Sequence, residues 1–395
     1  MEAEEPVFRR IRRIQHISLL VGVVLLIVLV IGALLDVRSF FRAYLFGFVF
    51  WTFLAVGCLG VLMLHHVVAG PWGFAVQRYL EAGARTFPLL AALFIPLIFG
   101  LRAIYPWLHP EMLAAFEVLR HKQPYLNVPF FLIRTLLYFV LWSVFGFLLS
   151  SYSRRLDREG DVSRVPAMRK LSAGGLVVFF LTATFSAIDW VMSIAPEWHS
   201  TIYGFLVMSG EGLSALSFVT VLFAWIGQYA IPEEHARHQL LQGLGNLILA
   251  FISLWAYMSF AQLIIIWSGN LPTEVRWYMS RTTEAWFIVT LVVVILHFTI
   301  PFVLLLFRQM KREPKLLGYL ALFIFAMRAV EVLWLIKPSF QWEVGQPVGV
   351  SWLDPVALLG LGAIWFAEFL RQIRKARLLP YRDPRMIRVF EEKVL

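Results

Sequence analysis

Hydrophobic residues run through this chain in ten long blocks separated by shorter polar segments. The blocks cover residues 17–35, 43–66, 86–106, 128–150, 172–194, 202–228, 239–268, 284–307, 316–336 and 352–372. At about 1.5 Å per helical residue, most of them can cross about 30 Å of hydrocarbon. They lack the alternation of barrel strands, and a backbone in lipid must satisfy its own hydrogen bonds. We therefore expect an all-α polytopic membrane protein with about ten transmembrane helices.

The composition excludes an ordinary soluble enzyme. Hydrophobic residues make up 60% of the chain and charged residues 15%, and the mean hydropathy is +0.74. Lys and Arg stand in short clusters between the blocks and form no basic face with interleaved aromatic residues, so no nucleic-acid partner is expected. The one cysteine, Cys58, lies within a hydrophobic block. The chain therefore has no disulfide and no thiolate set for a haem or an iron–sulfur cluster, and such a centre would belong to a partner.

The distribution of Lys and Arg predicts the orientation of the chain in the membrane. Of the 35 basic residues, 25 fall on the side that holds both termini, 8 fall on the other side, and Arg134 and Arg328 lie within blocks. The positive-inside rule therefore places both termini in the cytoplasm. We expect a cytoplasmic segment at 1–16, a membrane domain at 17–372 and a basic cytoplasmic tail at 373–395. No cleavage site follows the first block, so we interpret it as a retained span.

The count of blocks also suggests an internal organisation. The ranges 43–194 and 202–336 hold an even number of blocks each, which allows two four-helix bundles flanked by one helix at each end. The sequence similarity between the two ranges is too faint to call a repeat.

Ionisable residues inside blocks cost about 2.5–3.5 kcal/mol each on insertion scales and are therefore functional candidates. Asp189 and Glu211 flank a short outer turn, where they could form a polar ladder that enters from the outer face. The sixth block adds a polar stripe, which comprises Ser209, Ser214, Ser217 and Thr220. These groups are candidates for proton transfer, or else they hydrogen-bond neighbouring helices and hold them together.

Further proton-transfer candidates lie in the second, eighth and ninth blocks. Arg328 and Glu331 are three residues apart on one helix face, so they can act in a relay or simply neutralise each other. His297 is either a relay or a core histidine. His65 and His66 close the second block on the cytoplasmic side, and an interfacial role is expected for one of them. Opposed histidine pairs for a b-type haem bundle are lacking, which disfavours a cytochrome b.

Two outer segments, 187–204 and 260–278, are rich in aromatic residues and prolines. Tryptophans near span ends are expected to be interfacial anchors, and they include Trp51, Trp107, Trp198, Trp277 and Trp352. At these segments the chain resembles the polytopic membrane subunits of alternative complex III, within the NrfD/polysulfide-reductase membrane-subunit family. The matching signatures are Asp-Trp…Pro-x-Trp-x-Ser-Thr and Phe-x-Gln…Trp-x-x-Asn-x-Pro-x-Glu, with further matches at 58–66, 297–302 and 334–338. The resemblance covers residues from about 40 to 370.

The resemblance implies a ten-helix subunit of a complex that oxidises menaquinol or ubiquinol in the bacterial cytoplasmic (inner) membrane. Electrons would pass through an iron–sulfur subunit to c-type cytochrome subunits, so haem c and iron–sulfur clusters would lie in partners and none would be bound by this chain. Other implied partners are a paralogous NrfD-like membrane subunit, which is the favoured site of quinol oxidation, small membrane subunits and lipid.

The resemblance also implies a role in proton translocation, carried here by Asp189, Glu211, His297, Arg328 and Glu331, although the family pattern leads us to expect Asp where Glu331 stands. Two other functions stay open, a secondary transporter and a structural anchor for peripheral electron carriers. Transporter folds favour broken helices near the midplane, whereas Gly and Pro lie mainly at span ends here, with Gly243, Gly245, Gly360 and Gly362 as partial exceptions, which counts against the transporter.

Overall fold

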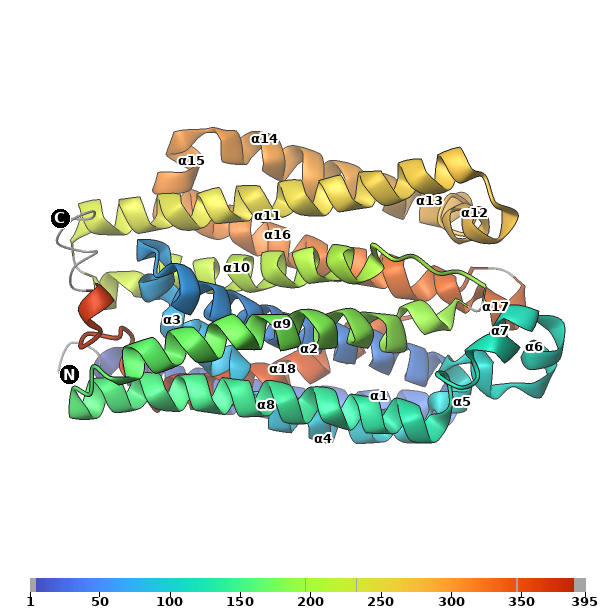
Figure 1. The fold of residues 1–395 in the computed structure, drawn as a ribbon, viewed down its shortest axis with the longest axis horizontal. Helices are drawn as coiled ribbons and strands as arrows, with labels where there is room; N and C mark the ends of the chain where they lie inside the picture. Colours follow the sequence, from blue (N-terminus) through green and yellow to red (C-terminus); the bar gives the residue numbers. More distant parts are fainter. Residues whose placement is uncertain (1–4, 196, 232, 346, 387–395) are drawn as a thin grey trace.

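The protein is an all-α polytopic membrane protein, as the hydrophobic blocks predict. The computed structural model describes residues 5–195, 197–231, 233–345 and 347–386. Within these residues, ten helices are long and apolar enough to cross a membrane. They lie side by side along one direction, and several short helices gather at one end (Figure 1).

The ten spans form two four-helix groups and two flanking helices. The first bundle contains α2 (Val37–Val68), a third span made of α3 (Pro71–Ala84) and α4 (Phe87–Phe99), α8 (Val128–Glu159) and α9 (Arg164–Trp190). The second bundle contains α10 (Tyr203–Ala230), α11 (Glu234–Gly269), an eighth span made of α13 (Glu284–Val292), η4 (Val293–Thr299) and α14 (Ile300–Leu306), and α16 (Pro314–Ile336). The flanking helices are α1 (Glu5–Leu35) and α18 (Leu353–Ile373), which pack against each other.

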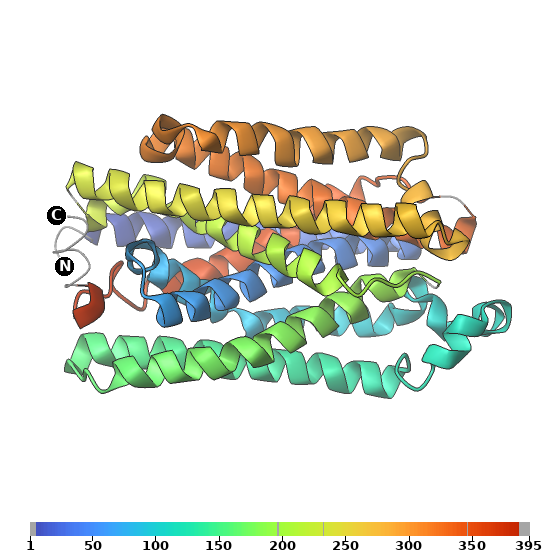
Figure 2. The same ribbon diagram turned by 45° about the horizontal axis from the view of Figure 1, so that its top comes forward.

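Short elements distinguish the two ends of the molecule. One end, here called the basic face, holds the α8–α9 and α10–α11 turns and α15 (Arg308–Arg312). The other end, here called the opposite face, carries eight short elements: α5 (Leu101–Ile104), η2 (Pro106–Leu108), α6 (Pro110–Ala115), α7 (Glu117–Lys122), η3 (Met192–Ile194), α12 (Pro272–Met279), η5 (Lys337–Phe340) and α17 (Gln341–Val344). Figure 2 shows the same separation after a turn of the molecule.

The centre of the molecule is the contact between α2 and α10. In the most apolar 18-residue stretch of each of these two helices, 89% of the residues are buried inside the protein, whereas in α1 17% are. The two central helices run in the same direction and meet at Gly57, where a Cβ atom would lie 2.0 Å from the carbonyl oxygen of Glu211. This close approach joins the first bundle to the second.

The third span begins much earlier than its hydrophobic block indicates. We predicted a loop before residue 86, but α3 starts at Pro71 and is almost entirely buried. Its polar residues Gln77, Arg78 and Glu81 lower the local hydropathy, so the segment does not look like a membrane helix in sequence. Helices α2, α8, α10, α11 and α18 cover it, which removes the need for a lipid-compatible surface.

Two of the ten spans are interrupted. The third span breaks at Arg85 and Thr86 between α3 and α4. The eighth span widens into the π-helical turn η4, in which the hydroxyl of Thr299 donates to the carbonyl of Val294 at 2.9 Å. Pro301 follows directly and has no N–H with which to continue the α-helical bonding. Such wide turns are frequent at functional sites, and this one carries His297.

The α2–α10 contact yields a stability prediction. Gly57→Val should push α2 away from the backbone of α10 and lower the midpoint of thermal unfolding in detergent by several degrees, because overpacking costs about 1–3 kcal/mol. Gly174→Val is the matched control, since a Cβ atom there meets nothing within 4 Å. Equal midpoints for the two variants would contradict the close contact.

Candidate functional site

A group of buried polar side chains, the central cluster, lies in the middle of the second bundle. It comprises Glu211 and Ser214 of α10, Trp255 of α11, His297 of η4, and Arg328 and Glu331 of α16. Nη1 of Arg328 lies 2.6 Å from Oε2 of Glu331, and the indole of Trp255 donates to Oε1 of Glu331 at 3.1 Å. Arg328 Nε donates to the Ser214 hydroxyl at 3.2 Å. The local i, i+3 pairing expected for Arg328 and Glu331 is therefore present, and it is tied to two other helices.

A glycine makes room for the arginine of this cluster. A Cβ atom on Gly210 would lie 2.1 Å from Nη2 of Arg328, so only a residue without a side chain leaves space for the guanidinium. The neighbouring Glu211 is fully buried and close enough to Arg328 to interact with it electrostatically. Among the described residues, neither oxygen of the Glu211 carboxyl has a hydrogen-bond partner. No described group therefore fixes the orientation of this carboxyl by a hydrogen bond.

His297 also lacks fixed polar contacts. Its ring packs edge-on against Trp255 with the ring centres 4.6 Å apart, and the side chain is fully buried. Within the part of the chain that the structure describes, neither ring nitrogen has a hydrogen-bond partner. A histidine that served only as a core hydrogen-bonding group would be expected to use at least one nitrogen.

Asp189 is held in a different way from Glu211. Arg134 of α8 donates to both of its carboxylate oxygens, from Nε at 2.8 Å and from Nη2 at 2.9 Å, and Tyr138 donates at 2.7 Å. The guanidinium lies over the ring of Tyr125 at 3.8 Å. This bidentate pair ties α8 to α9 inside the first bundle. No hydrogen bond joins Asp189 to Glu211 in the described residues.

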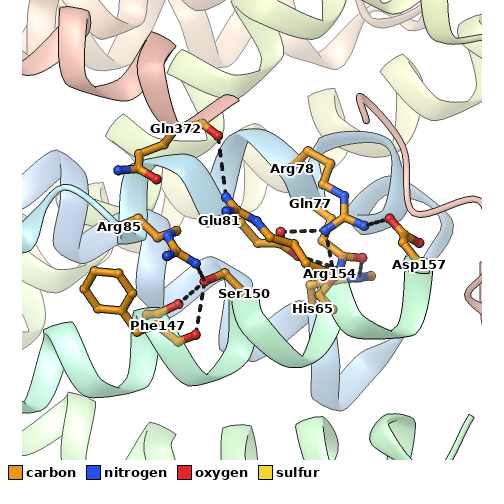
Figure 3. A network of polar contacts seen from close by, with 12 residues as sticks. His65, Gln77, Arg78, Glu81, Arg85, Phe147, Ser150, Arg154, Asp157 and Gln372 are labelled. Atoms are coloured by element: carbon orange, nitrogen blue, oxygen red, sulfur yellow. Dashed lines mark hydrogen bonds and ion pairs between the residues drawn. The ribbon is translucent and has the colours of Figure 1, made fainter. Parts of the chain in front are cut away.

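A second polar network lies near the basic face (Figure 3). Nε2 of His65 lies 3.2 Å from the side-chain oxygen of Gln77, whose amide nitrogen donates to Glu81 at 2.9 Å. Arg78 pairs with Glu81 at 2.7 Å and also with Asp157 of α8. Three of these residues lie on α3, in the segment that we predicted to be a loop, so sequence reasoning missed them. Glu81 lies four residues after Gln77 and three after Arg78, and this helical spacing was the signal that could have indicated a helix here.

Both histidines of α2 are buried within the protein near the basic face. His65 and His66 have no exposed surface, because α3 folds back over the end of α2. A Cβ atom on Gly73 of α3 would lie 1.9 Å from the His65 ring, which shows how closely the two helices approach. The nitrogens of the His66 ring have no hydrogen-bond partner among the described residues.

The polar stripe of α10 leads from the central cluster toward these histidines. Ser209 and Ser214 donate to backbone carbonyls of their own helix, whereas the buried hydroxyls of Ser217 and Thr220 have no partner in the described part of the chain. Since α2 and α10 run in the same direction from their contact at Gly57 and Glu211, His66 and Thr220, nine residues further on, lie at a similar depth, about 13 Å along the helices. Nine residues are about two and a half helical turns, so both positions lie on other faces of their helices than the contact.

Two tryptophans of the aromatic segments lie in the interior of the protein near the opposite face. Trp198 and Trp277 are 3% and 4% exposed and stack with ring centres 4.4 Å apart, so the expectation that they are interfacial anchors is wrong. Arg281 lies 3.4 Å from the Trp277 ring centre and donates to the carbonyls of Trp277 and Leu335. Burial lowers the pKa of Arg281 to about 9, which still leaves it positively charged at neutral pH.

These features define a polytopic membrane protein with a charged interior in both bundles. No family model matches the chain, and no curated protein matches it. Among the described residues, no three His, Cys, Asp or Glu side chains are grouped as metal ligands would be.

The geometry of Asp189 predicts a structural effect. Asp189→Asn leaves the buried Arg134 without its counter-charge and should destabilise the first bundle by about 3–5 kcal/mol. Thermal unfolding in detergent measures this as a large fall in the midpoint. Tyr138→Phe is the control, because it removes one hydrogen bond and keeps the ion pair, and it should cost about 1 kcal/mol. If Asp189→Asn is no less stable than Tyr138→Phe, the ion pair does not hold these helices together.

Proposed function

We propose that this chain is a membrane subunit of a quinol:cytochrome c-type oxidoreductase, alternative complex III, of the ActF type, and that it contributes to proton translocation and to assembly of the complex. The signatures in the two aromatic segments support the family. The charged interior supports the proton role, since ionisable groups inside a membrane protein mark ion and proton pathways.

The partners of this proposed subunit would carry the redox chemistry. They are a paralogous membrane subunit, an iron–sulfur subunit, c-type cytochromes and small membrane subunits. Menaquinol or ubiquinol would be the substrate of the complex, and this chain would be inactive alone. The structure described above supplies such a complex with a helical platform and with short helices at the opposite face.

The main support for the proton role is the environment of the Glu211 carboxyl. Its carboxyl is buried, lies beside Arg328 and bonds to no other group in the described residues. Asp189, in contrast, is held by three hydrogen bonds, and we assign it a structural role. A proton carrier must change partners, which Glu211 can do and Asp189 cannot do without breaking its ion pair. We assign Glu211 as the central carrier.

We infer a route on each side of Glu211. Toward the basic face it follows Ser217 and Thr220 to the depth of His66, and His65 continues it through Gln77 to Glu81. Within the second bundle it includes His297, with Arg328 and Glu331 as the charged pair that sets the field around the carboxyl. Waters would complete the gaps, because buried hydroxyls and ring nitrogens without protein partners are sites where ordered water binds.

The proton role is tested with Glu211→Gln in the whole complex. The substitution keeps the shape of the side chain and breaks no hydrogen bond to a described residue, so the complex should assemble normally. Proton movement through this subunit, measured as quinol-driven acidification in sealed vesicles, should fall at least about tenfold. Glu111→Gln is the control, because that side chain is 67% exposed at the opposite face. Normal coupling in an assembled Glu211→Gln complex would refute the role.

We also propose that the basic face lies in the cytoplasm. A single buried cysteine, Cys58, gives a low background for thiol labelling. In right-side-out vesicles, a membrane-impermeant maleimide should label Glu117→Cys on α7 before lysis, and should label Glu159→Cys at the end of α8 only after lysis. The reverse pattern would invert the proposed orientation.

A secondary transporter is the second candidate, and the broken third span favours it. Discontinuous helices line substrate sites in many transporters, and the break at Arg85 and Thr86 lies close to the charged residues of α3. Purification separates the candidates. Co-isolation with haem c and iron–sulfur polypeptides supports the redox complex, whereas an isolated chain that moves solute supports the transporter. A chain that co-isolates but carries no protons would be a structural anchor.

A further inference from the structure

A large cavity opens from the second bundle toward lipid. It has a volume of about 620 Å³ and lies between α11, α13, η4 and α16. Most of its wall is aromatic or aliphatic, including Trp255, Phe298 and Trp334. Tyr257 and Phe260 stand at its rim on α11 and are 66% and 62% exposed, and exposed side chains on a membrane span face hydrocarbon. An alkyl chain could therefore enter this cavity sideways from the bilayer.

Arg281 lines one end of this cavity. The side chain is 1% exposed, and its Nε has no hydrogen-bond partner among the described residues. Glu331 lines the same cavity but is paired with Arg328. Glu197 lines a neighbouring cavity that Arg281 also borders, but it is paired with Arg276. Within the described residues, Nη1 and Nη2 of Arg281 donate to backbone carbonyls and serine hydroxyls, Nε has no partner, and no anion pairs with this buried positive charge. An unpaired buried charge is costly unless a ligand supplies the counter-charge.

The position of Arg281 matches the depth of a lipid head group. It lies in the connection between α12 and α13, outside the membrane-spanning segments on either side. A second cavity of about 420 Å³ continues from Arg281 toward the opposite face, with Trp277, Ser339 and Gln341 in its wall. Arg281 therefore lies between an apolar cavity open to lipid and a more polar cavity at the end of the bundle.

We propose that this site binds an anionic phospholipid, with its phosphate at Arg281 and one acyl chain in the lipid-facing cavity. Arginine binds phosphate through strong charge-assisted hydrogen bonds, and basic pockets between membrane helices are known to take anionic lipid head groups. A neutral quinone ring would leave the charge of Arg281 without an anion. A free phosphate would leave the apolar cavity unfilled. The proposal does not depend on the proton role of Glu211.

The head-group contact is tested on the full chain purified in detergent. Native mass spectrometry should show phosphatidylglycerol bound at least about tenfold more tightly than phosphatidylcholine, whose ammonium offsets the phosphate charge. Arg281→Gln should abolish this preference. Arg120→Gln is the matched control, because Arg120 is an arginine on α7 at the same face whose side chain is exposed, and it should keep the preference. Equal binding of the two lipids by the wild-type chain would overturn the anionic head group.

The acyl-chain contact has its own test, because Arg281 also bonds the end of α16 and its removal can affect folding. Ala256→Phe fills the lipid-facing cavity and leaves every bond of Arg281 in place, so it should weaken phosphatidylglycerol binding about tenfold. Ala285→Phe, on an exposed position of α13 outside the cavity, should leave binding unchanged. Undiminished binding in Ala256→Phe, or displacement of the lipid by inorganic phosphate at equal concentration, would overturn the proposal.

Discussion

The constraint on which this structure depends is that charges buried among membrane helices must find counter-charges there. Removing an ion from water is expensive, and the cost is offset only when a partner of opposite charge and further hydrogen bonds are in place. Arg134 and Asp189 join α8 to α9, and Lys337 pairs with Asp354 at 2.7 Å to join η5 to α18. Arg78 joins α3 to α8 through Asp157. Each pair fixes the relative position of two segments whose apolar surfaces could slide against each other, since hydrocarbon contacts alone are non-directional.

Buried ionisable groups that lack such a partner in the described residues are therefore the ones that suggest a function. Glu211 and His297 lie in the interior of the second bundle and bond to no described residue, while the neighbouring Arg328 and Glu331 are paired. Arg281 is the cationic counterpart at the opposite face, where an anion from the bilayer could complete the site. The first bundle, in contrast, holds its acid in a closed set of bonds. Both bundles therefore contain ion-paired groups, while the buried carboxyl without a partner in the described residues, Glu211, lies in the second.

The two interrupted spans contribute residues to these sites. The break between α3 and α4 allows a polar helix to occupy the interior beside His65 and His66, where it supplies Gln77 and Glu81. The wide turn of η4 places His297 against Trp255 and also contributes residues to the lipid-facing cavity. Irregular backbone is tolerated at membrane depth where it is covered by protein or lines a cavity, and both interruptions meet that condition.

Hydropathy along the chain determined the number of spans and most of their bounds, because crossing hydrocarbon requires about 20 apolar residues wherever the segment lies in the fold. The ion pair of Arg328 and Glu331 was also predictable, since helical geometry places residues three apart on one face. The partner of Asp189 was not, because Arg134 lies 55 residues away and only packing of α8 on α9 brings them together. Tertiary structure likewise decided that α3 is a buried helix and that Trp198 and Trp277 are interior. Burial by other helices has no local pattern in sequence, since it depends on what packs against a segment rather than on what the segment contains.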